Sequence, residues 1–202
     1  MRLYDNLDSG NCYKVRLLLA QLGRDYELIE IDTDRGESRT PEFLAKNPNG
    51  RVPVLETDDG VYLAESNAIL WYLAEGTEFV PTSAIGRAQV LQWMLFEQYS
   101  HEPYVAVARY IVRHLPVDHP RRAELPDRIK NGLAAFGVME THLKSRQFFV
   151  DDTYSLADIA LYAYSHVAHQ GGFDLKLFPA VRHWLERVAA QPGYIPITLK
   201  PG

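Results

Sequence analysis

Cysteine is almost absent from this sequence, since Cys12 is the only one in 202 residues. A single cysteine excludes a disulfide framework within the chain and is typical of proteins kept under reducing conditions. The sequence also has no apolar run long enough to cross a bilayer, and it does not open on a basic segment followed by an apolar one. We therefore expect a cytoplasmic protein with no membrane partner.

Basic residues are fewer than acidic ones: the sequence has 21 Lys and Arg and 26 Asp and Glu, so the formal net charge is −5. Nucleic-acid binding depends on a basic field that meets phosphates, so this composition argues against nucleic acid as a partner. The histidines show no metal-ligand spacing, and we predict no metal site. Walker loops, G-x-S-x-G elbows and dinucleotide-binding fingerprints are missing too.

Before residue 77 the sequence alternates short apolar runs with helical periods, which predicts a domain over residues 1–76 with the order βαβαββα. The expected strands are Arg2–Asp5, Tyr26–Asp32, Val54–Glu56 and Val61–Leu63, and the expected helices are Cys12–Leu22, a short helix after Pro41, and Ser66–Ala74. In the first helix, apolar residues recur at helical spacing on one face, and Lys14 and Arg16 fall on the other. We expect that helix to pack one side on the sheet.

Residues 77–85 contain turn residues without a sustained period, and we interpret them as a linker. Residues 86–202 then carry helical periods almost throughout, which predicts an all-helical domain. The expected helices are Arg87–Leu115, kinked or divided near Pro103, then Arg121–Lys144, Leu156–Val167 and Pro179–Gln191. Ser155 and Asp158 form a capping-box pattern. The predicted fold class is an α/β domain followed by an all-α domain.

Three short segments follow one another along the chain: NGRVPVLE at residues 49–56, LAESNAILWYL at 63–73 and TYSLADIALY at 153–162. By this ordered set the chain resembles the cytosolic glutathione transferase family over nearly its whole length, in a bacterial-type variant with Ser or a Ser/Asn pair in the active site. The resemblance implies a thioredoxin-like first domain that binds glutathione and a helical domain that supplies a second-substrate pocket. Glutathione is then a co-substrate, and no other cofactor is expected.

Pro53 stands inside an apolar run, although proline cannot donate to a sheet ladder. In the family that the chain resembles, the matching proline follows a cis peptide bond, and the residue before it pairs with the cysteinyl part of glutathione. The resemblance therefore implies that Val52 binds glutathione and that Pro53 shapes the site. The plainer alternative is that Pro53 starts an edge strand.

Glu65 and Ser66 precede an apolar helical period, so they should lie at a helix N-terminus, where N–H groups and the helix dipole favour an anion. The resemblance implies that Ser66 meets the γ-glutamyl carboxylate of glutathione and Glu65 its ammonium. A plain N-cap and a first-turn acid explain the same pair, and the two interpretations are compatible.

The segment Ser9-Gly10-Asn11-Cys12 stands where a thioredoxin-like fold holds a Cys-x-x-Cys pair. Because Ser9 replaces the leading thiol, a dithiol oxidoreductase is disfavoured. We predict that Ser9 or Asn11, with the helix dipole, lowers the pKa of glutathione's own thiol. Classes of the family use Tyr, Ser, Cys, or a hydroxyl followed two residues later by Asn, so the choice between Ser9 and Asn11 stays open.

The neighbouring side chains are weaker candidates for the thiolate donor. We expect Tyr4 to point into the fold and Tyr13 to lie too far along the helix. Cys12 is expected to be a partly buried apolar residue, with a mixed disulfide as the less favoured alternative.

Two further groups follow from the resemblance. The resemblance implies that the glycyl end of glutathione makes polar contacts with Arg39, Asn49 and Arg51, although surface solvation explains a lone Arg equally well. It also implies that Tyr99, His101 and Tyr104 line the second-substrate pocket, although an aromatic stripe at helical spacing is more often part of a core.

We interpret the protein as a glutathione transferase that conjugates glutathione to a small electrophile. Two alternatives stay open, a glutathione-dependent disulfide-bond reductase or peroxidase and a non-catalytic binding or scaffold protein of the same fold. The resemblance also implies a homodimer. Its interface is expected near the start of the long helix, where four residues offer more apolar surface than one core face needs: Val90, Leu91, Met94 and Leu95.

Overall fold

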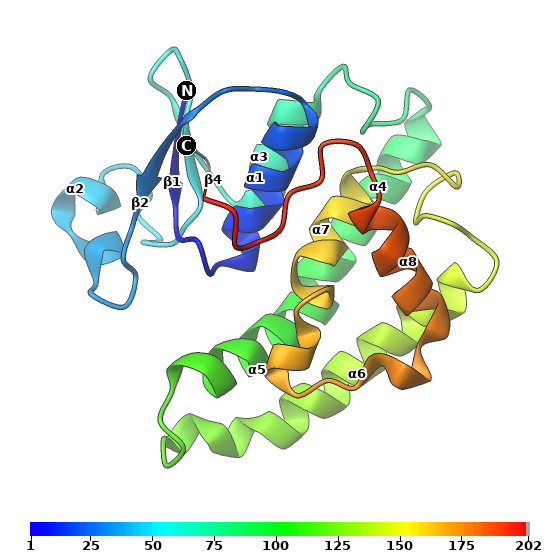
Figure 1. The fold of residues 1–202 in the computed structure, drawn as a ribbon. Helices are drawn as coiled ribbons and strands as arrows, with labels where there is room; N and C mark the ends of the chain where they lie inside the picture. Colours follow the sequence, from blue (N-terminus) through cyan, green and yellow to red (C-terminus); the bar gives the residue numbers. More distant parts are fainter. Residues whose placement is uncertain (201–202) are drawn as a thin grey trace. The chain divides into compact units, whose positions relative to one another are not determined.

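The computed structural model describes residues 1–200, which divide into two compact units (Figure 1). Unit 1 comprises residues 1–76 and the tail of residues 192–200, and unit 2 comprises residues 77–191. The sequence places that tail in the helical domain, whereas in the structure it returns to unit 1. Within residues 1–200, no helix combines the length and the apolarity that a bilayer span requires.

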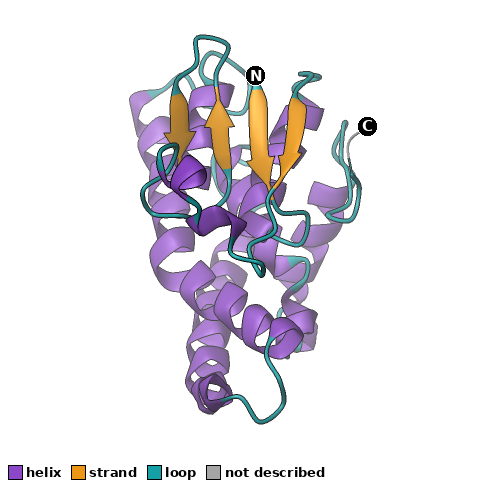
Figure 2. Cartoon of the chain, turned by 90° about the vertical axis from the view of Figure 1, so that its left-hand side faces the viewer, coloured by secondary structure: helices purple, strands orange, loops and turns teal. Residues whose placement is uncertain are grey.

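Unit 1 contains a four-stranded sheet in the order β2-β1-β3-β4, and Figure 2 shows the strands side by side. β2 runs parallel to β1, whereas β3 is antiparallel to β1 and to β4. The strands are β1 Arg2–Asp5, β2 Glu27–Glu30, β3 Val54–Glu56 and β4 Tyr62–Ala64, and the helices are α1 Gly10–Gln21, α2 Pro41–Leu44 and α3 Ser66–Ala74, with a 3₁₀ turn at Glu37–Arg39. The predicted order βαβαββα is confirmed.

Helix α1 is buried from Cys12 to Leu19, so the expectation that only one of its sides packs against the protein is wrong. The side chains of Lys14 and Arg16 are fully buried. The tail runs alongside α1 (Figure 1) and its backbone carbonyls accept hydrogen bonds from the helix: Tyr13 Oη donates to Ile195 O at 2.7 Å, and Arg16 Nη1 donates to Ile197 O and Leu199 O, both at 3.1 Å. Lys14 and Arg16 therefore face protein rather than water.

A buried ion pair ties α1 to the sheet. Arg16 Nε lies 3.0 Å from Asp5 Oδ2, and neither side chain is exposed. Burial raises the pKa of the Asp5 carboxyl, and the guanidinium of Arg16 opposes that rise. Removing either partner would leave a buried charge without compensation, which is strongly destabilising.

Unit 2 is helical in all its main elements, as predicted. It contains α4 Ala84–Phe96, a π-helical turn at Glu97–His101, α5 Glu102–His114, α6 Leu125–Leu143, α7 Leu156–Ser165 and α8 Pro179–Ala189, with 3₁₀ turns at Pro120–Glu124, Ala168–Gly171 and Leu175–Leu177. The predicted helix Arg87–Leu115 is divided by the π turn, and Pro103 lies in the first turn of α5. Proline is tolerated there because a first-turn N–H has no intrahelical partner.

Helix α7 is buried along its whole length and holds the centre of unit 2. At its start, Asp158 Oδ2 accepts from the N–H of Ser155 at 3.0 Å and from its Oγ at 3.1 Å, which agrees with the predicted capping pair. Asp158 Oδ1 accepts from Trp184 Nε1 at 2.9 Å and from the N–H of Phe149 at 3.3 Å. One carboxyl thus joins α7, α8 and the loop before α7.

Candidate functional site

Val52 and Pro53 lie directly before β3 and outside the sheet. The peptide bond between Val52 and Pro53 is cis, and β3 begins at Val54. Val54 pairs with Tyr4 of β1 on one side and with Ala64 of β4 on the other, so both ladders begin after Val52. The Val52 side chain packs on the apolar cluster beneath the sheet. Val52 therefore lies at the N-terminal end of β3, outside both ladders.

The N-terminus of α1 is capped by Ser9, whose Oγ accepts from the N–H of Cys12 at 3.3 Å. Cys12 is fully buried, and its Sγ accepts from the N–H of Asn6 at 3.3 Å. Burial raises the pKa of the Cys12 thiol well above its ordinary value, and the Asp5 carboxyl adds to the rise. A buried, protonated thiol is a poor nucleophile.

Helices α1 and α3 bring two of the predicted site residues together. Ser66 Oγ donates to Asn11 Oδ1 at 3.2 Å, and Ser66 is only 5% exposed. Lys14 Nζ, one turn further along α1, lies 3.5 Å from Ser66 Oγ and 3.5 Å from Asn67 Oδ1. Sequence reasoning missed Lys14 and Asn67 as neighbours of the site, because the helical period places Lys14 on the polar face of α1.

Glu65 occupies an unusual backbone conformation at the start of α3, with φ 68° and ψ 112°. A positive φ is costly for a residue with a Cβ, and such positions cluster at binding sites. Its carbonyl accepts the first intrahelical bond, from Ile69 N–H at 2.9 Å, and its side chain is exposed. The first-turn N–H groups of α3 have no intrahelical acceptor, and Glu65 directly precedes that turn in the chain. The two together can meet a ligand that carries both an anion and a cation.

The loop before Val52 is held by a buried asparagine that the sequence does not single out. Asn47 is 5% exposed, its Nδ2 donates to Arg51 O at 2.8 Å, and its Oδ1 accepts from Asn49 N–H at 3.1 Å. Arg39 Nη1 donates to Asn49 O at 2.9 Å. Gly50 has φ 62°, and a Cβ there would lie 2.6 Å from Arg39 Nη1. Arg39 and Asn49 thus shape this loop, whereas the Arg51 side chain is exposed.

The tyrosines near α1 are engaged elsewhere. Tyr4 Oη donates to Glu56 Oε2 at 2.8 Å, and burial raises the pKa of the Tyr4 phenol above its ordinary value. Tyr13 is fully buried and bonds to the tail. Both tyrosine hydroxyls are therefore engaged by groups other than Ser9 and Asn11.

The three aromatic residues predicted for a second substrate differ in exposure. Tyr99 is 84% exposed on the π turn, and Tyr104 is half-buried on α5. His101 is fully buried, lies 3.0 Å from Ser165 Oγ through its Nε2, and meets the ring of Phe136 edge-on. The structure therefore places His101 within the core of unit 2, which agrees with the core alternative for that residue.

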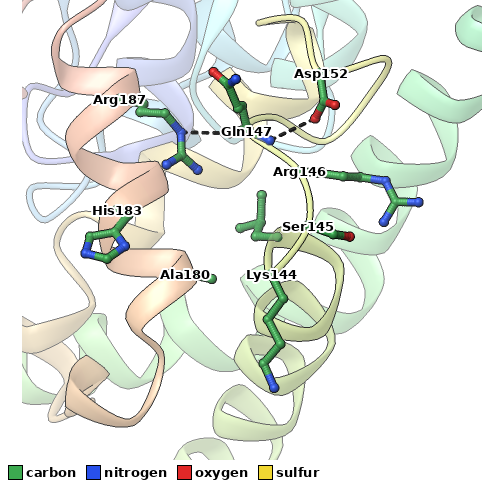
Figure 3. Close-up of a pocket in the computed structure, with 9 residues that line it drawn as sticks. Lys144, Ser145, Arg146, Gln147, Asp152, Ala180, His183 and Arg187 are labelled. Carbon is green, nitrogen blue, oxygen red and sulfur yellow. Dashed lines mark hydrogen bonds between the residues drawn. The ribbon is translucent and has the colours of Figure 1, made fainter.

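A separate surface hollow of about 380 Å³ lies in unit 2, between the end of α6 and α8 (Figure 3). Lys144, Arg146, His183 and Arg187 line it, but Figure 3 shows Lys144 and Arg146 extending away from one another. Arg187 Nε donates to Gln147 O at 3.0 Å. No predicted site residue lines this hollow, and its charges do not converge. Nor does any group of three or more His, Cys, Asp and Glu in residues 1–200 suit a metal ion.

Comparisons with known proteins agree on one family. Residues 1–75 match the family model described as glutathione S-transferase, N-terminal domain, and residues 93–192 match glutathione S-transferase, C-terminal domain. The crystal structure of a possible glutathione S-transferase from Rhodopseudomonas palustris is similar, with 51% sequence identity, a TM-score of 0.94, and coverage of 99% of this chain and 90% of that one.

Other relatives have different names or bound molecules. The disulfide-bond oxidoreductase YfcG of Escherichia coli is 31% identical over 91% of this chain and 87% of its own. A glutathione transferase from Pseudomonas putida, solved with one glutathione disulfide bound per subunit, is 26% identical with a TM-score of 0.84, over 95% of this chain and 87% of that chain. Protein URE2 of Eremothecium gossypii is 28% identical over 96% of this chain, which spans 66% of its length.

Proposed function

The chain belongs to the glutathione S-transferase family, and from this we propose that it is a glutathione transferase that binds glutathione and conjugates it to a small electrophile. The observation that carries the proposal is the hydrogen bond between Asn11 and Ser66, because it joins the expected thiolate donor to the expected γ-glutamyl contact. A metal has no part in this chemistry, since the family uses glutathione itself as the substrate that supplies the nucleophile.

Glutathione has three parts, and unit 1 offers a group for each. The backbone of Val52, shaped by Pro53, pairs with the cysteinyl part as an added strand. The first turn of α3 at Ser66 holds the γ-glutamyl carboxylate, and the carboxylate of Glu65 holds its ammonium. The loop ordered by Arg39 and Asn49, with Arg51 beside it, receives the glycyl end.

The reaction begins with loss of the glutathione thiol proton to solvent. The Ser9 hydroxyl or the Asn11 amide donates a hydrogen bond to the resulting thiolate, and the positive end of the α1 dipole adds to its stabilisation. The thiolate then attacks the electrophilic carbon of the second substrate. A C–S bond forms, and the leaving group departs with its bonding electron pair. The exposed Tyr99 and the half-buried Tyr104 are our candidates for contact with the electrophile, whereas the buried His101 supports the π turn.

A second candidate function is glutathione-dependent disulfide reduction. The similarity to a disulfide-bond oxidoreductase and the neighbour with bound glutathione disulfide favour it. In that reaction one glutathione thiolate attacks a disulfide, forms a mixed disulfide and releases one thiolate. A second glutathione thiolate then attacks the glutathione sulfur of the mixed disulfide, which forms glutathione disulfide and releases the other thiolate. No protein thiol is required, which suits the buried Cys12. A non-catalytic binding protein stays the third possibility, and the paired Asn11 and Ser66 argue against it.

Three measurements separate these functions. Calorimetry tests glutathione binding, turnover of a chloronitrobenzene tests conjugation, and turnover of hydroxyethyl disulfide with glutathione tests reduction. We expect binding and conjugation, and we expect Cys12→Ala to retain both. Binding without either turnover would identify a binding protein, and turnover of the disulfide alone would identify a reductase. Absence of glutathione binding would overturn the proposal.

The family resemblance also leads us to propose a homodimer, and cytoplasm as the compartment, because a reducing compartment keeps glutathione as the free thiol.

A further inference from the structure

Lys14 is a fully buried lysine beside the proposed thiolate site. It lies on α1, one turn after Asn11, and its Nζ is 3.5 Å from Ser66 Oγ and 3.5 Å from Asn67 Oδ1 on α3. Lysine is among the residues least often fully buried, and its burial requires polar partners. Packing alone would explain an apolar residue at this buried position, but it does not explain a lysine.

The hydrogen-bond directions around Lys14 are fixed by chemistry. A lysine nitrogen can only donate, so at the Lys14 contact Ser66 Oγ must accept. The one hydroxyl hydrogen of Ser66 is then directed to Asn11 Oδ1, at 3.2 Å. Asn11 consequently accepts with its carbonyl oxygen on the α3 side. Nδ2 of the same amide is then directed away from Ser66.

We propose that Lys14 is a positioning residue that acts through Ser66 to hold the amide of Asn11 with Nδ2 toward the glutathione thiolate. In a flipped amide, Nδ2 would become a second donor to Ser66 Oγ, the buried Ser66 hydroxyl hydrogen would lose Asn11 Oδ1 as its acceptor, and a carbonyl oxygen would turn toward the thiolate. The first orientation stabilises the thiolate and the second repels it. The inference rests on the proposed function, in which Asn11 donates to the thiolate.

The hydroxyl and the backbone N–H of Ser66 can act at different parts of glutathione, the hydroxyl through Asn11 and the N–H directly. Its hydroxyl is used within the protein, between Lys14 and Asn11. Its backbone N–H lies in the first turn of α3 and remains the group suited to a carboxylate. Binding of the γ-glutamyl end therefore need not break the contact that orients Asn11.

The test compares the pKa of the bound glutathione thiol, followed by its ultraviolet thiolate absorbance against pH at saturating glutathione. Lys14→Met keeps the length of the buried stem and removes the donor. We expect it to raise the bound-thiol pKa by about one unit, which is about tenfold less thiolate at a pH below that pKa. Lys176→Met is the matched control, because that lysine is exposed in unit 2 and lies 4.0 Å from Asp174 at the surface. It should leave the bound-thiol pKa unchanged.

A double-mutant cycle separates positioning from a simple charge effect. If Lys14 acts through Asn11, adding Lys14→Met to Asn11→Ala changes nothing further. A charge that acts directly on the thiolate would raise the pKa by the same amount in both backgrounds, and that additive result would overturn the inference. Should Lys14→Met fail to fold, Ser66→Ala interrupts the same chain at its middle. An unchanged bound-thiol pKa in that variant would also overturn it.

The wild-type titration keeps the two proposals distinguishable. A bound thiol with an ordinary pKa in the wild-type protein would refute thiolate stabilisation by this protein, and the role of Lys14 with it. A depressed pKa in wild type that survives Lys14→Met would overturn only the role of Lys14.

Discussion

Asn11 Oδ1 and Ser66 Oγ are joined by a hydrogen bond of 3.2 Å, although 55 residues separate them in the chain. The bond links the first turns of α1 and α3, so the N-termini of two helices are held at one place in unit 1. Each N-terminus presents N–H groups and the positive end of a helix dipole. A ligand with a thiolate and a carboxylate suits this pair of ends.

The first prediction distinguishes the role of Asn11 in stabilising the thiolate from the role of Ser9 in capping α1. Asn11→Ala should raise the pKa of bound glutathione's thiol and lower kcat/KM for a chloronitrobenzene by about 10- to 100-fold, because a donor to the developing charge is lost. Ser9→Ala should destabilise the ligand-free protein by about 1 kcal/mol, since Ser9 caps α1. Thermal unfolding and thiolate titration of both variants check this. Loss of turnover in Cys12→Ala alone would contradict the mechanism.

The second prediction concerns the charge of Glu65. Glu65→Gln removes the proposed partner of the γ-glutamyl ammonium while keeping the size of the side chain. Because Glu65 is exposed without ligand, we expect a loss smaller than for a buried pair, about 5- to 30-fold in glutathione affinity. The melting temperature of the ligand-free protein should barely change. Calorimetry that finds unaltered affinity would remove Glu65 from the site.

A third prediction uses the backbone of the same residue. Glu65 has φ 68°, a conformation that glycine adopts without the strain caused by a Cβ. Glu65→Gly should therefore stabilise the ligand-free protein by about 0.5–1 kcal/mol while it weakens glutathione binding at least as much as Glu65→Gln. Chemical denaturation and calorimetry on the same preparation would show both effects. A destabilised Glu65→Gly would mean that the Glu65 side chain supports the fold rather than the ligand.

Local patterns predict much of unit 1. The strands Arg2–Asp5 and Val54–Glu56 and the helix Ser66–Ala74 begin and end where the apolar periods and the turn residues indicate. The burial of Lys14 and Arg16 could not be predicted in this way. Lys14 meets a residue 52 positions away, and Arg16 meets carbonyls 181 and 183 positions away. A helical period reports the polarity of a face and not the distant segments that cover it.

The site shows the same division. The helix start at Glu65 and Ser66 follows from local signals, whereas no pattern in the sequence predicts the contact between Asn11 and Ser66. Asn47, which ties Asn49 to the carbonyl of Arg51, gives no signal beyond a turn composition. The side chain that orders a binding loop need not contact the ligand, so its role is visible only in the fold.

The fourth prediction concerns assembly and corrects the expected interface. Val90 and Met94 are 0% and 3% exposed, so they belong to the core of unit 2, while Leu91 and Leu95 are 42% and 66% exposed. Only the latter two can meet a second copy of the chain. We expect light scattering to give the mass of a dimer for wild type and the mass of a monomer for Leu95→Glu. Val117→Glu is the control, because Val117 is 86% exposed and lies outside the helices. A wild-type monomer at micromolar concentration would reject the dimer.

The last prediction concerns pH and the buried carboxyl of Asp158. Burial raises its pKa from 3.8 to about 7, against four hydrogen-bond donors that favour the charged form: Trp184 Nε1, the N–H of Phe149, and the N–H and Oγ of Ser155. A raised pKa means that the folded state binds the proton more tightly than the unfolded chain. The contribution of Asp158 to stability is then full below pH 4 and is lost as pH rises toward 7.

Across that window the contribution of Asp158 to the free energy of unfolding should fall with pH, by at most about 1.4 kcal/mol per pH unit. Asp158→Asn cannot titrate, and it also disturbs the four hydrogen bonds, so it should be less stable at every pH. The informative quantity is therefore the difference in free energy of unfolding between wild type and Asp158→Asn at each pH. Denaturant unfolding from pH 4.5 to 7 should show that difference shrinking as pH rises. A difference that grows instead would mean that the four donors lower the pKa of Asp158, and that the capping carboxylate is charged in the folded protein.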